Sequence, residues 1–434
     1  MAPRLYNLFP LLAGPVEDWH AHLPRIAAMG FDWIYLNPFH EPGGSGSLYA
    51  IRDYARLHPV LQGQGGPVAA DQIARFAAAA RDHGVRVMAD LVINHTANDA
   101  LLVETSPHWY RREDDGALYA PRAVDPDDPS NVTIWGDLAE IDYHRDDLRT
   151  EQIAYWSGLV QGYLDQGISG FRCDAAYQVP AEVWRPLIDV ARNTAPDVVF
   201  AAETLGCAVE QVRLLAEAGF DFLFNSSKWW DFEAPWLLAQ YEEFRHIAPS
   251  IAFPESHDTP RLVTELGDAD LVMVERTYRL RHLFATVFST GVMMPIGYEY
   301  GADAPLHVVD SRPEQWKALA RRPRFDLSGF IADCNQLKAR VPALGVEGPQ
   351  RVVSPPGDPV VVLLRLEGAP DGSAVLTLIN PGSEGPQACD LDTLDLAADM
   401  RAGLMEVTPG ATGGPLPDGG TVTVGPTEMR VFAR

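Results

Sequence analysis

The sequence predicts an eight-stranded α/β barrel, the (β/α)8 TIM-barrel class, with one inserted domain and a C-terminal antiparallel β domain. Short apolar runs alternate with helical segments over residues 1–97 and 150–345, and this alternation implies parallel βαβ units. We count eight such units, the number that closes a barrel. A polar stretch, 98–149, interrupts them after the third strand. From 346 to 434, short apolar runs alternate with Gly- and Pro-rich turns, a pattern typical of antiparallel sheets.

The elements of the barrel follow from local pattern. Several expected helices end at a glycine, the residue that most readily ends a helix. The third strand is apolar almost throughout, as expected of a strand buried on both faces. The predicted strands are 5–12, 31–36, 85–92, 170–176, 198–202, 220–224, 250–253 and 292–296. The predicted helices are 16–29, 68–83, 150–166, 181–194, 208–218, 232–247 and 270–289, with further segments at 314–320 and 328–341.

Composition limits the classes of partner and compartment. The net charge of −25 argues against a nucleic-acid partner or an anionic membrane surface, because both reward clustered Lys and Arg. The four cysteines have no paired spacing that indicates a disulfide framework or a zinc site. The first residues do not resemble a signal peptide, and no apolar run is long enough to span a bilayer. We therefore expect a reduced, cytoplasmic protein of undetermined oligomeric state.

The stretch from Gly170 to Asp174 reads as a short buried strand at the centre of this organisation. Side chains alternate across a strand, so Arg172 and Asp174 point to the same side. A guanidinium beside a carboxylate favours the ionised carboxylate, which is the form that a nucleophile needs. On these residues alone, a buried structural ion pair explains the pattern equally well.

Polar side chains follow four different strands at the same end of the predicted barrel. In this fold the active site lies at the C-terminal ends of the strands. Chance alone rarely places five such residues at the same end of a barrel, so we interpret them as one site. They are His95 after the third strand, Asp174 in the fourth, Glu203 after the fifth, and His257 and Asp258 after the seventh.

Four short motifs resemble, in order and spacing, the signatures of the α-amylase family, glycoside hydrolase family 13. The resemblance covers roughly residues 5–340, and the insertion and the final β domain are similar to that family's domains B and C. The segment Trp135-Gly136-Asp137 lies where domain B of the family has a short signature. The four motifs are Asp90-x-x-x-Asn94-His95, Gly170-Phe171-Arg172-x-Asp174, Glu203 and His257-Asp258.

The resemblance implies a retaining mechanism based on three carboxyl groups. Asp174 would be the nucleophile, Glu203 the general acid/base, and Asp258 the carboxylate that binds and distorts the sugar. Arg172 would hold Asp174 ionised. A general acid must keep its proton near neutral pH, so Glu203 should have the less polar surroundings. Its sequence neighbours are small or apolar and include no arginine.

The resemblance also implies contacts with the sugar. Tyr49 would stack on the ring, His95 and His257 would hydrogen-bond its hydroxyls, and Asp90 is counted with the substrate-binding residues.

The segment Lys228-Trp229-Trp230, after the sixth strand, is a further candidate for binding sugar, because sugar rings present apolar C–H faces to aromatic side chains. We count all three residues as substrate-binding, and we expect one tryptophan to be exposed and the other buried.

The sequence departs from starch-cleaving members of the family just after the nucleophile. Those members have a Lys-His pair three and four residues on, where this chain has Tyr177-Gln178. The pair helps to bind the leaving part of a polymer and to ligate a structural calcium, so its absence weakens the expectation of an endo-acting amylase and of calcium. Asn94 stands where the family often has a calcium ligand. We expect no required cofactor and leave a structural calcium at Asn94 open.

The leading hypothesis is a retaining α-glycosidase that acts on α-linked gluco-oligosaccharides through a covalent glycosyl-aspartate intermediate. The alternative is a transglycosylase that moves a maltosyl or glucosyl unit, because only the group that resolves the intermediate differs, water or a sugar hydroxyl. A non-catalytic sugar-binding protein is a remote alternative, since all three carboxylates are intact. A phosphorylated donor would need a cationic pocket, and the spacing of Lys228, Arg52 and Arg261 does not indicate one.

Overall fold

A computed structural model of the chain describes residues 2–63, 69–124, 130–366, 369 and 371–434. The predicted barrel is confirmed: eight parallel strands close on themselves in the order β1-β14-β13-β12-β11-β10-β5-β2. The strands are β1 (Arg4–Asn7), β2 (Trp33–Leu36), β5 (Arg86–Leu91), β10 (Gly170–Cys173), β11 (Val199–Ala202), β12 (Phe222–Phe224), β13 (Ser250–Ala252) and β14 (Gly291–Pro295).

Helices surround the barrel, and several differ in length from the prediction. The expected strand 5–12 ends at Asn7, because Pro10 begins a short helix. The expected helix 16–29 is interrupted by the 3₁₀ turn η1 (His20–His22). Residue 68, the first residue of the expected helix 68–83, lies outside the described residues. The barrel helices are α1 (Pro10–Ala13), α2 (Val16–Trp19), α3 (Leu23–Ala28), α4 (Ala69–Asp82), α6 (Asp146–Asp165), α7 (Ala181–Thr194), α8 (Val209–Arg213), α9 (Trp236–Phe244), α10 (Leu262–Glu265), α11 (Leu271–Phe288), α12 (Pro313–Arg321) and α13 (Ser328–Arg340).

Two predicted helices are shorter than the sequence pattern indicated. The segment 208–218 is α-helical only over α8, because the amides of Leu215, Ala216 and Ala218 bond three residues back, which tightens the chain into turns. The segment 232–247 is helical only over α9.

The loop predicted over 37–47 contains a strand that the sequence pattern did not indicate. Here β3 (His40–Pro42) pairs in antiparallel fashion with β4 (Ile51–Leu57). Tyr49 lies between the two strands of this hairpin, which returns the chain to the mouth of the barrel.

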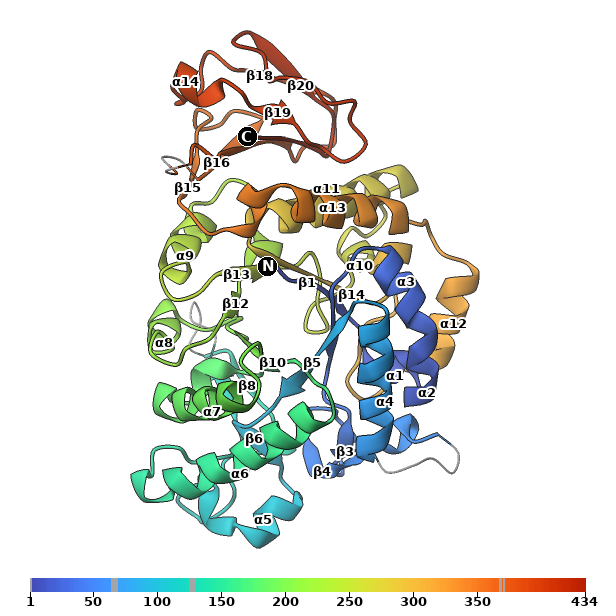
Figure 1. Cartoon of the computed structure of the whole chain (residues 1–434), viewed down its shortest axis with the longest axis vertical. Helices are drawn as coiled ribbons and strands as arrows, with labels where there is room; N and C mark the ends of the chain where they lie inside the picture. The colour runs from blue at the N-terminus through green and yellow to red at the C-terminus, as the bar shows by residue number, and fades with distance from the viewer. Residues whose placement is uncertain (1, 64–68, 125–129, 367–368, 370) are drawn as a thin grey trace.

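The insertion after β5 forms a small unit of its own. Its outer strands are β6 (His95–Ala97) and β9 (Leu138–Glu140), which pair with each other, so the start and the end of the insertion meet beside His95. Between them lie α5 (Leu101–Thr105) and a ribbon of β7 (Arg122–Val124) and β8 (Val132–Ile134). In Figure 1 this unit lies at the lower end, close to α6.

The C-terminal part is the predicted antiparallel β domain, and in Figure 1 it lies at the top, over α11 and α13. One apolar cluster joins them, with Phe284 of α11 packed in the same core as Val361, Ile379 and Val431 of the sheet. The sheet order is β15-β16-β17-β21-β19, with β18-β20 separate. The elements are β15 (Gln350–Val352), β16 (Val361–Arg365), β17 (Val375–Asn380), β18 (Gln387–Asp390), α14 (Ala398–Arg401), β19 (Met405–Glu406), β20 (Thr421–Val424) and β21 (Glu428–Ala433).

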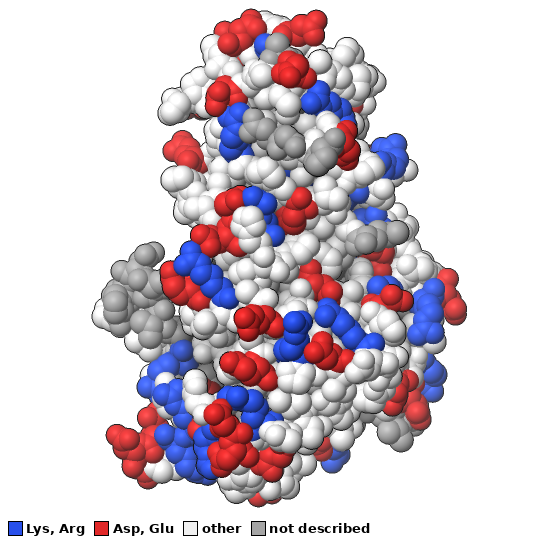
Figure 2. Space-filling view, turned by 60° about the vertical axis from the view of Figure 1, so that its left-hand side comes forward, with Lys and Arg blue, Asp and Glu red and all other residues white. Residues whose placement is uncertain are grey.

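The surface carries both signs of charge. On the face drawn in Figure 2, acidic and basic side chains are interspersed, and the described residues of that face form no continuous basic area. In the part of the chain that the structure describes, none of the helices is long and apolar enough to cross a membrane.

Candidate active site

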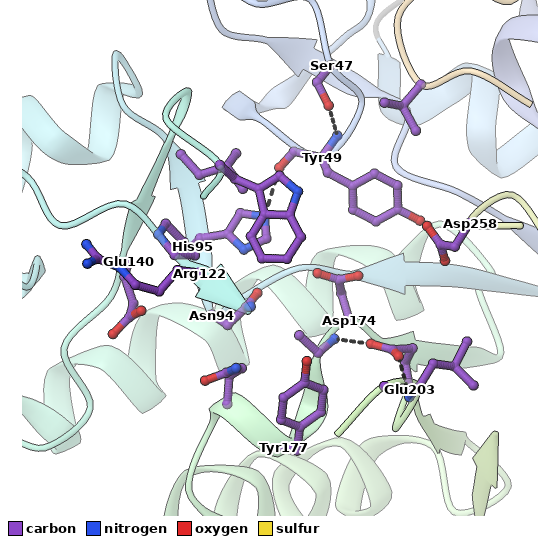
Figure 3. Close-up of a pocket in the computed structure, with 18 of the residues that line it drawn as sticks. Ser47, Tyr49, Asn94, His95, Arg122, Glu140, Asp174, Tyr177, Glu203 and Asp258 are labelled. Carbon is purple, nitrogen blue, oxygen red and sulfur yellow. Dashed lines mark hydrogen bonds between the residues drawn. The ribbon is translucent and has the colours of Figure 1, made fainter. Parts of the chain in front are cut away.

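Three carboxyl groups from three strands meet in one cavity of about 700 Å³ at the C-terminal end of the barrel (Figure 3). Asp174 directly follows β10, Glu203 directly follows β11, and Asp258 lies in the loop after β13. The parallel register pairs Cys173 with Ala202, so the next residues, Asp174 and Glu203, lie side by side at the C-terminal ends of the two strands. This is the end of the barrel at which the sequence placed the site.

Arg172 is the central cation of the cavity. Its Nη1 donates to Asp174 Oδ1 at 2.6 Å and to Asp90 Oδ1 at 3.0 Å, and its side chain is only 5% exposed. Two carboxylates therefore share one guanidinium, which orients the Asp174 carboxylate toward the cavity. The expectation that Arg172 and Asp174 lie on one side of their strand is confirmed.

Asp90 supports this arrangement from below the cavity floor. Its side chain is fully buried, and Oδ2 accepts hydrogen bonds from the hydroxyls of Tyr35 and Tyr49, both at 2.7 Å. Burial raises the pKa of Asp90 to about 6, against the opposing effect of Arg172. A direct sugar contact does not fit this geometry, because the Asp90 oxygens are already occupied and covered.

Glu203 has the surroundings of a general acid. Burial raises its pKa to about 7, with Arg172 acting in the opposite direction and Asp174 adding to the rise. Its Oε2 accepts from the Ala175 amide at 2.9 Å and its Oε1 from the Leu205 amide at 2.6 Å. No arginine adjoins Glu203 in the sequence, but the fold brings Arg172 Nη2 to 3.9 Å from Glu203 Oε2.

The backbone at Ala175 is strained, and the strain serves this contact. Ala175 has φ of +40°, in the left-handed region that residues with a Cβ rarely adopt. Ala175 directly follows Asp174, and this turn directs its amide toward the Glu203 carboxyl group (Figure 3). The hydrogen bond therefore fixes Glu203, the acid/base candidate, relative to Asp174, the nucleophile candidate.

Tyr49, His257 and Asp258 form a second group on the other side of the cavity. The rings of Tyr49 and His257 lie parallel, with an angle of 2° and 5.5 Å between centroids. His257 Nε2 lies 2.6 Å from the Tyr49 hydroxyl and 3.2 Å from Asp258 Oδ2. The His257 side chain is only 3% exposed, whereas Tyr49 lines the cavity. Of the two stacked rings, Tyr49 is therefore the one that a ligand in the cavity can contact.

His95 and Asn94 line the cavity next to domain B. His95 Nε2 lies 3.2 Å from the Tyr49 carbonyl oxygen, and burial lowers the His95 pKa, which favours the neutral ring. Asn94 Oδ1 is buried and has no hydrogen-bond partner among the described residues. The same described residues contain no group of three His, Cys, Asp or Glu side chains placed to hold a metal ion. Calcium sites usually include several carboxylate ligands, and no such cluster accompanies Asn94 among the described residues, so the fit is poor.

The Lys228-Trp229-Trp230 segment divides between surface and core. Trp229 is 48% exposed and lines the cavity, whereas Trp230 is 1% exposed and packs on Phe284 in the core shared with the C-terminal domain. This matches the expectation of one exposed and one buried tryptophan. A sugar contact through Trp230 does not fit, because its indole lies beneath the surface.

Lys228 also lies beneath the surface. Its ammonium group donates to both carboxylate oxygens of Glu265, at 2.8 and 2.9 Å, and its side chain is 4% exposed. A direct contact between Lys228 and substrate therefore does not fit either. The other cations considered for a phosphate, Arg261 and Arg52, are also paired with carboxylates, those of Glu255 and Glu41.

Several cavity residues were not among the predicted site residues. They come from domain B and from loops at the rim of the barrel, and position in the fold reveals those that no sequence motif marks. The domain B signature and the Tyr177-Gln178 departure were the signals that pointed to some of them. The wall includes Trp135, Asp137, Glu140, Tyr177, Gln178 and Leu205.

Comparison with known proteins supports a common family. Residues 5–114 match the family model "Glycogen debranching enzyme, glucanotransferase domain". An α-1,4-glucan:maltose-1-phosphate maltosyltransferase of Burkholderia pseudomallei is 31% identical over 394 residues, which cover 89% of this chain and 34% of that protein. The enzyme of the same name from Pseudomonas aeruginosa is 27% identical over 79% of this chain and 53% of its own length. The chain thus spans between one third and about half of these relatives.

Solved structures show the same fold. An α-amylase from Geobacillus thermoleovorans superposes with a TM-score of 0.75 at 15% identity, covering 100% of this chain and 98% of that one. An α-amylase from Lactobacillus plantarum gives 0.74 at 21% identity, with 100% and 99% coverage. The barrel with its two added domains, the ordered motifs that meet in the cavity, and these relatives together place the chain in the α-amylase family, glycoside hydrolase family 13.

Proposed function

We propose that the protein is a retaining transglycosylase that moves an α-linked glucosyl or maltosyl unit from one α-gluco-oligosaccharide to another. The observation that carries the proposal is the exposed indole of Trp229 in the same cavity as Asp174 and Glu203. An apolar platform beside the acid/base favours a sugar as the group that resolves the intermediate, because a sugar ring stacks on an indole and water does not. The maltosyltransferase relatives support transfer over the hydrolase hypothesis.

The reaction has two displacements at the anomeric carbon. In the first, the Asp174 carboxylate attacks C1, the bond from C1 to the leaving oxygen breaks, and Glu203 gives its proton to that oxygen. In the second, an acceptor hydroxyl attacks C1, its proton passes to Glu203, and the bond to Asp174 breaks. Two inversions retain the α configuration. Asp258 and Tyr49 line the wall on which the transferred sugar would lie.

The charge of the cavity favours an unphosphorylated donor. A sugar phosphate carries about −1.5 to −2 charges near pH 7 and needs free cations. Among the described residues of the wall, both guanidinium groups are engaged: Arg172 with Asp90 and Asp174, and Arg122 with Glu113. Carboxyl groups outnumber them on the same wall, contributed by Asp137, Glu140, Asp174, Glu203 and Asp258. We therefore propose neutral gluco-oligosaccharides as donors, in contrast to the maltose 1-phosphate named for the relatives.

The test is a time course of products from maltotriose through maltoheptaose, resolved by length. Transfer gives products longer than the starting sugar, in steps of one or two glucose units that identify the transferred unit. Shorter products alone would mean that water resolves the intermediate, and the hydrolase hypothesis would replace this proposal. Incubation with α-maltose 1-phosphate and a glucan acceptor, with free phosphate measured, tests the neutral donor separately.

A matched pair of variants tests the platform. Trp229→Ala should lower the ratio of transfer to hydrolysis, because the acceptor loses its stacking surface, whereas Trp236→Ala removes an indole of similar exposure, 38%, that does not line the cavity. An equal effect of both variants would contradict the role of Trp229.

A further inference from the structure

We infer that Lys228 and Glu265 form a positioning pair that holds Trp229 in place as the acceptor platform. The inference rests on the proposed function and names what orients its platform. Lys228 and Trp229 are neighbours in the 3₁₀ turn η5 (Ser227–Trp229), yet one is buried and the other is 48% exposed. The buried cation therefore has a structural task at the edge of the cavity.

The contacts of Lys228 are directed at the indole and away from the cavity. The ammonium nitrogen lies 5.8 Å from the centroid of the Trp229 ring, within the range of cation–π attraction. Its two hydrogen bonds to Glu265 fix the position of the charge, and Phe253 meets the indole nearly at right angles, at 87° and 6.1 Å. The indole is thus supported by a charge and by an aromatic edge, while about half of its surface stays free.

Glu265 is itself held by the loop that carries Asp258. It is the last residue of α10, and the first residue of that helix, Leu262, donates its amide to Glu255 Oε2 at 2.7 Å. Arg261 Nη1 donates to Glu255 Oε1 at 2.6 Å, so a fully buried carboxylate fixes the start of α10. Through this short helix, the ion pair connects the loop after β13, with Asp258, to the loop after β12, with Trp229.

The pair should therefore affect how an acceptor binds and leave the loading of the donor unchanged. Removal of the Lys228 charge frees the indole to rotate, and Glu265, which is 32% exposed, can be solvated without a buried charge left behind. We expect Lys228→Met to raise the acceptor concentration for half-maximal transfer roughly two- to thirtyfold, the range that loss of one cation–π contact implies.

The experiment uses α-maltosyl fluoride as donor and maltotetraose as acceptor. Fluoride release without acceptor reports loading of the enzyme and its hydrolysis, and the titration with acceptor reports platform function. Lys228→Met should change only the titration, and Lys228→Arg should restore it, because the guanidinium keeps the charge over the ring. Arg279→Met is the control, since Arg279 also pairs with a carboxylate, Glu275, and lies over an aromatic ring, Phe330, but this ring does not line the cavity.

The outcomes separate this inference from the proposed function. An unchanged acceptor requirement in Lys228→Met, with a clear increase in Trp229→Ala, would overturn the positioning pair and leave the transglycosylase proposal intact. A parallel fall of fluoride release and transfer in Lys228→Met would also overturn it, because the role would then be one of general stability. An unchanged acceptor requirement in Trp229→Ala would instead remove the platform, and with it the observation on which the proposed function rests.

Discussion

The protonation of Glu203 leads to a quantitative prediction about pH. Burial raises its pKa from 4.5 to about 7, despite the proximity of Arg172. If Glu203 protonates the leaving oxygen, about half of the enzyme is competent at pH 7, against about 0.3% for a carboxyl group that kept a pKa of 4.5. The fold thus raises the competent fraction by about two orders of magnitude. The kcat/KM for a malto-oligosaccharide donor should fall about tenfold between pH 6 and pH 8.

The variant Glu203→Gln tests whether this group is the acid. It should lower kcat/KM for maltohexaose by about 10²–10⁴-fold and remove the alkaline fall, because no proton is left to titrate. With α-maltosyl fluoride the loss in the first step should be much smaller, since fluoride departs without a full proton transfer. Initial rates with both donors from pH 5 to pH 9 give the comparison.

A second variant controls for the general charge of the cavity. Glu140→Gln removes another carboxyl group from the same wall, one that pairs with Arg111 at 3.0 Å. This variant should keep an alkaline midpoint near pH 7. A wild-type profile that is flat from pH 6 to pH 8, or a Glu203→Gln profile that still falls around pH 7, would refute the assignment of the acid.

Three further predictions concern the nucleophile, stability and metal. Asp174→Ala should abolish turnover and keep the thermal transition of the wild type; near-wild-type rates in a folded variant would remove Asp174 from its role and reopen the non-catalytic alternative. Glu203 binds its proton more tightly in the folded state, so its contribution to stability is full below pH 4.5 and is lost as pH rises through about 7. Relative to Glu203→Gln, the wild type should therefore lose about 2–3 kcal/mol of unfolding free energy between pH 5 and pH 8, measured by urea denaturation; equal losses would contradict the raised pKa. Incubation with EDTA should leave the melting temperature and the rate unchanged, because the described residues contain no group of three His, Cys, Asp or Glu side chains placed to hold a metal ion; a fall that calcium reverses would establish a metal site.

The sequence by itself determined the barrel and the three carboxyl groups. Strand–helix alternation is a local property, and a barrel of parallel strands directs every strand end to one rim, so residues that follow strands must meet there. Asp174, Glu203 and Asp258 could therefore be assigned to one site without coordinates. The pairing of Arg172 with Asp174 was also predictable, because side chains two residues apart on one strand point to the same side.

Only the tertiary structure decided the surroundings of those groups. Arg172 comes within 3.9 Å of Glu203 because β10 and β11 are neighbours in the barrel, a relation that the local sequence around Glu203 does not contain. The left-handed turn at Ala175 has no sequence signal, since alanine rarely adopts it, yet it aims an amide at Glu203.

The same distinction explains the Lys228-Trp229-Trp230 segment. Three adjacent residues after a strand look equivalent as sugar contacts in the sequence, but a tight turn sends successive side chains in different directions. Burial then depends on which partners the neighbouring helices place beside each side chain. Lys228 is buried against Glu265 of α10, and Trp230 packs on Phe284 of α11, whereas Trp229 faces the cavity. Local pattern determined which residues reach the rim, and long-range packing decided which of them a substrate can touch.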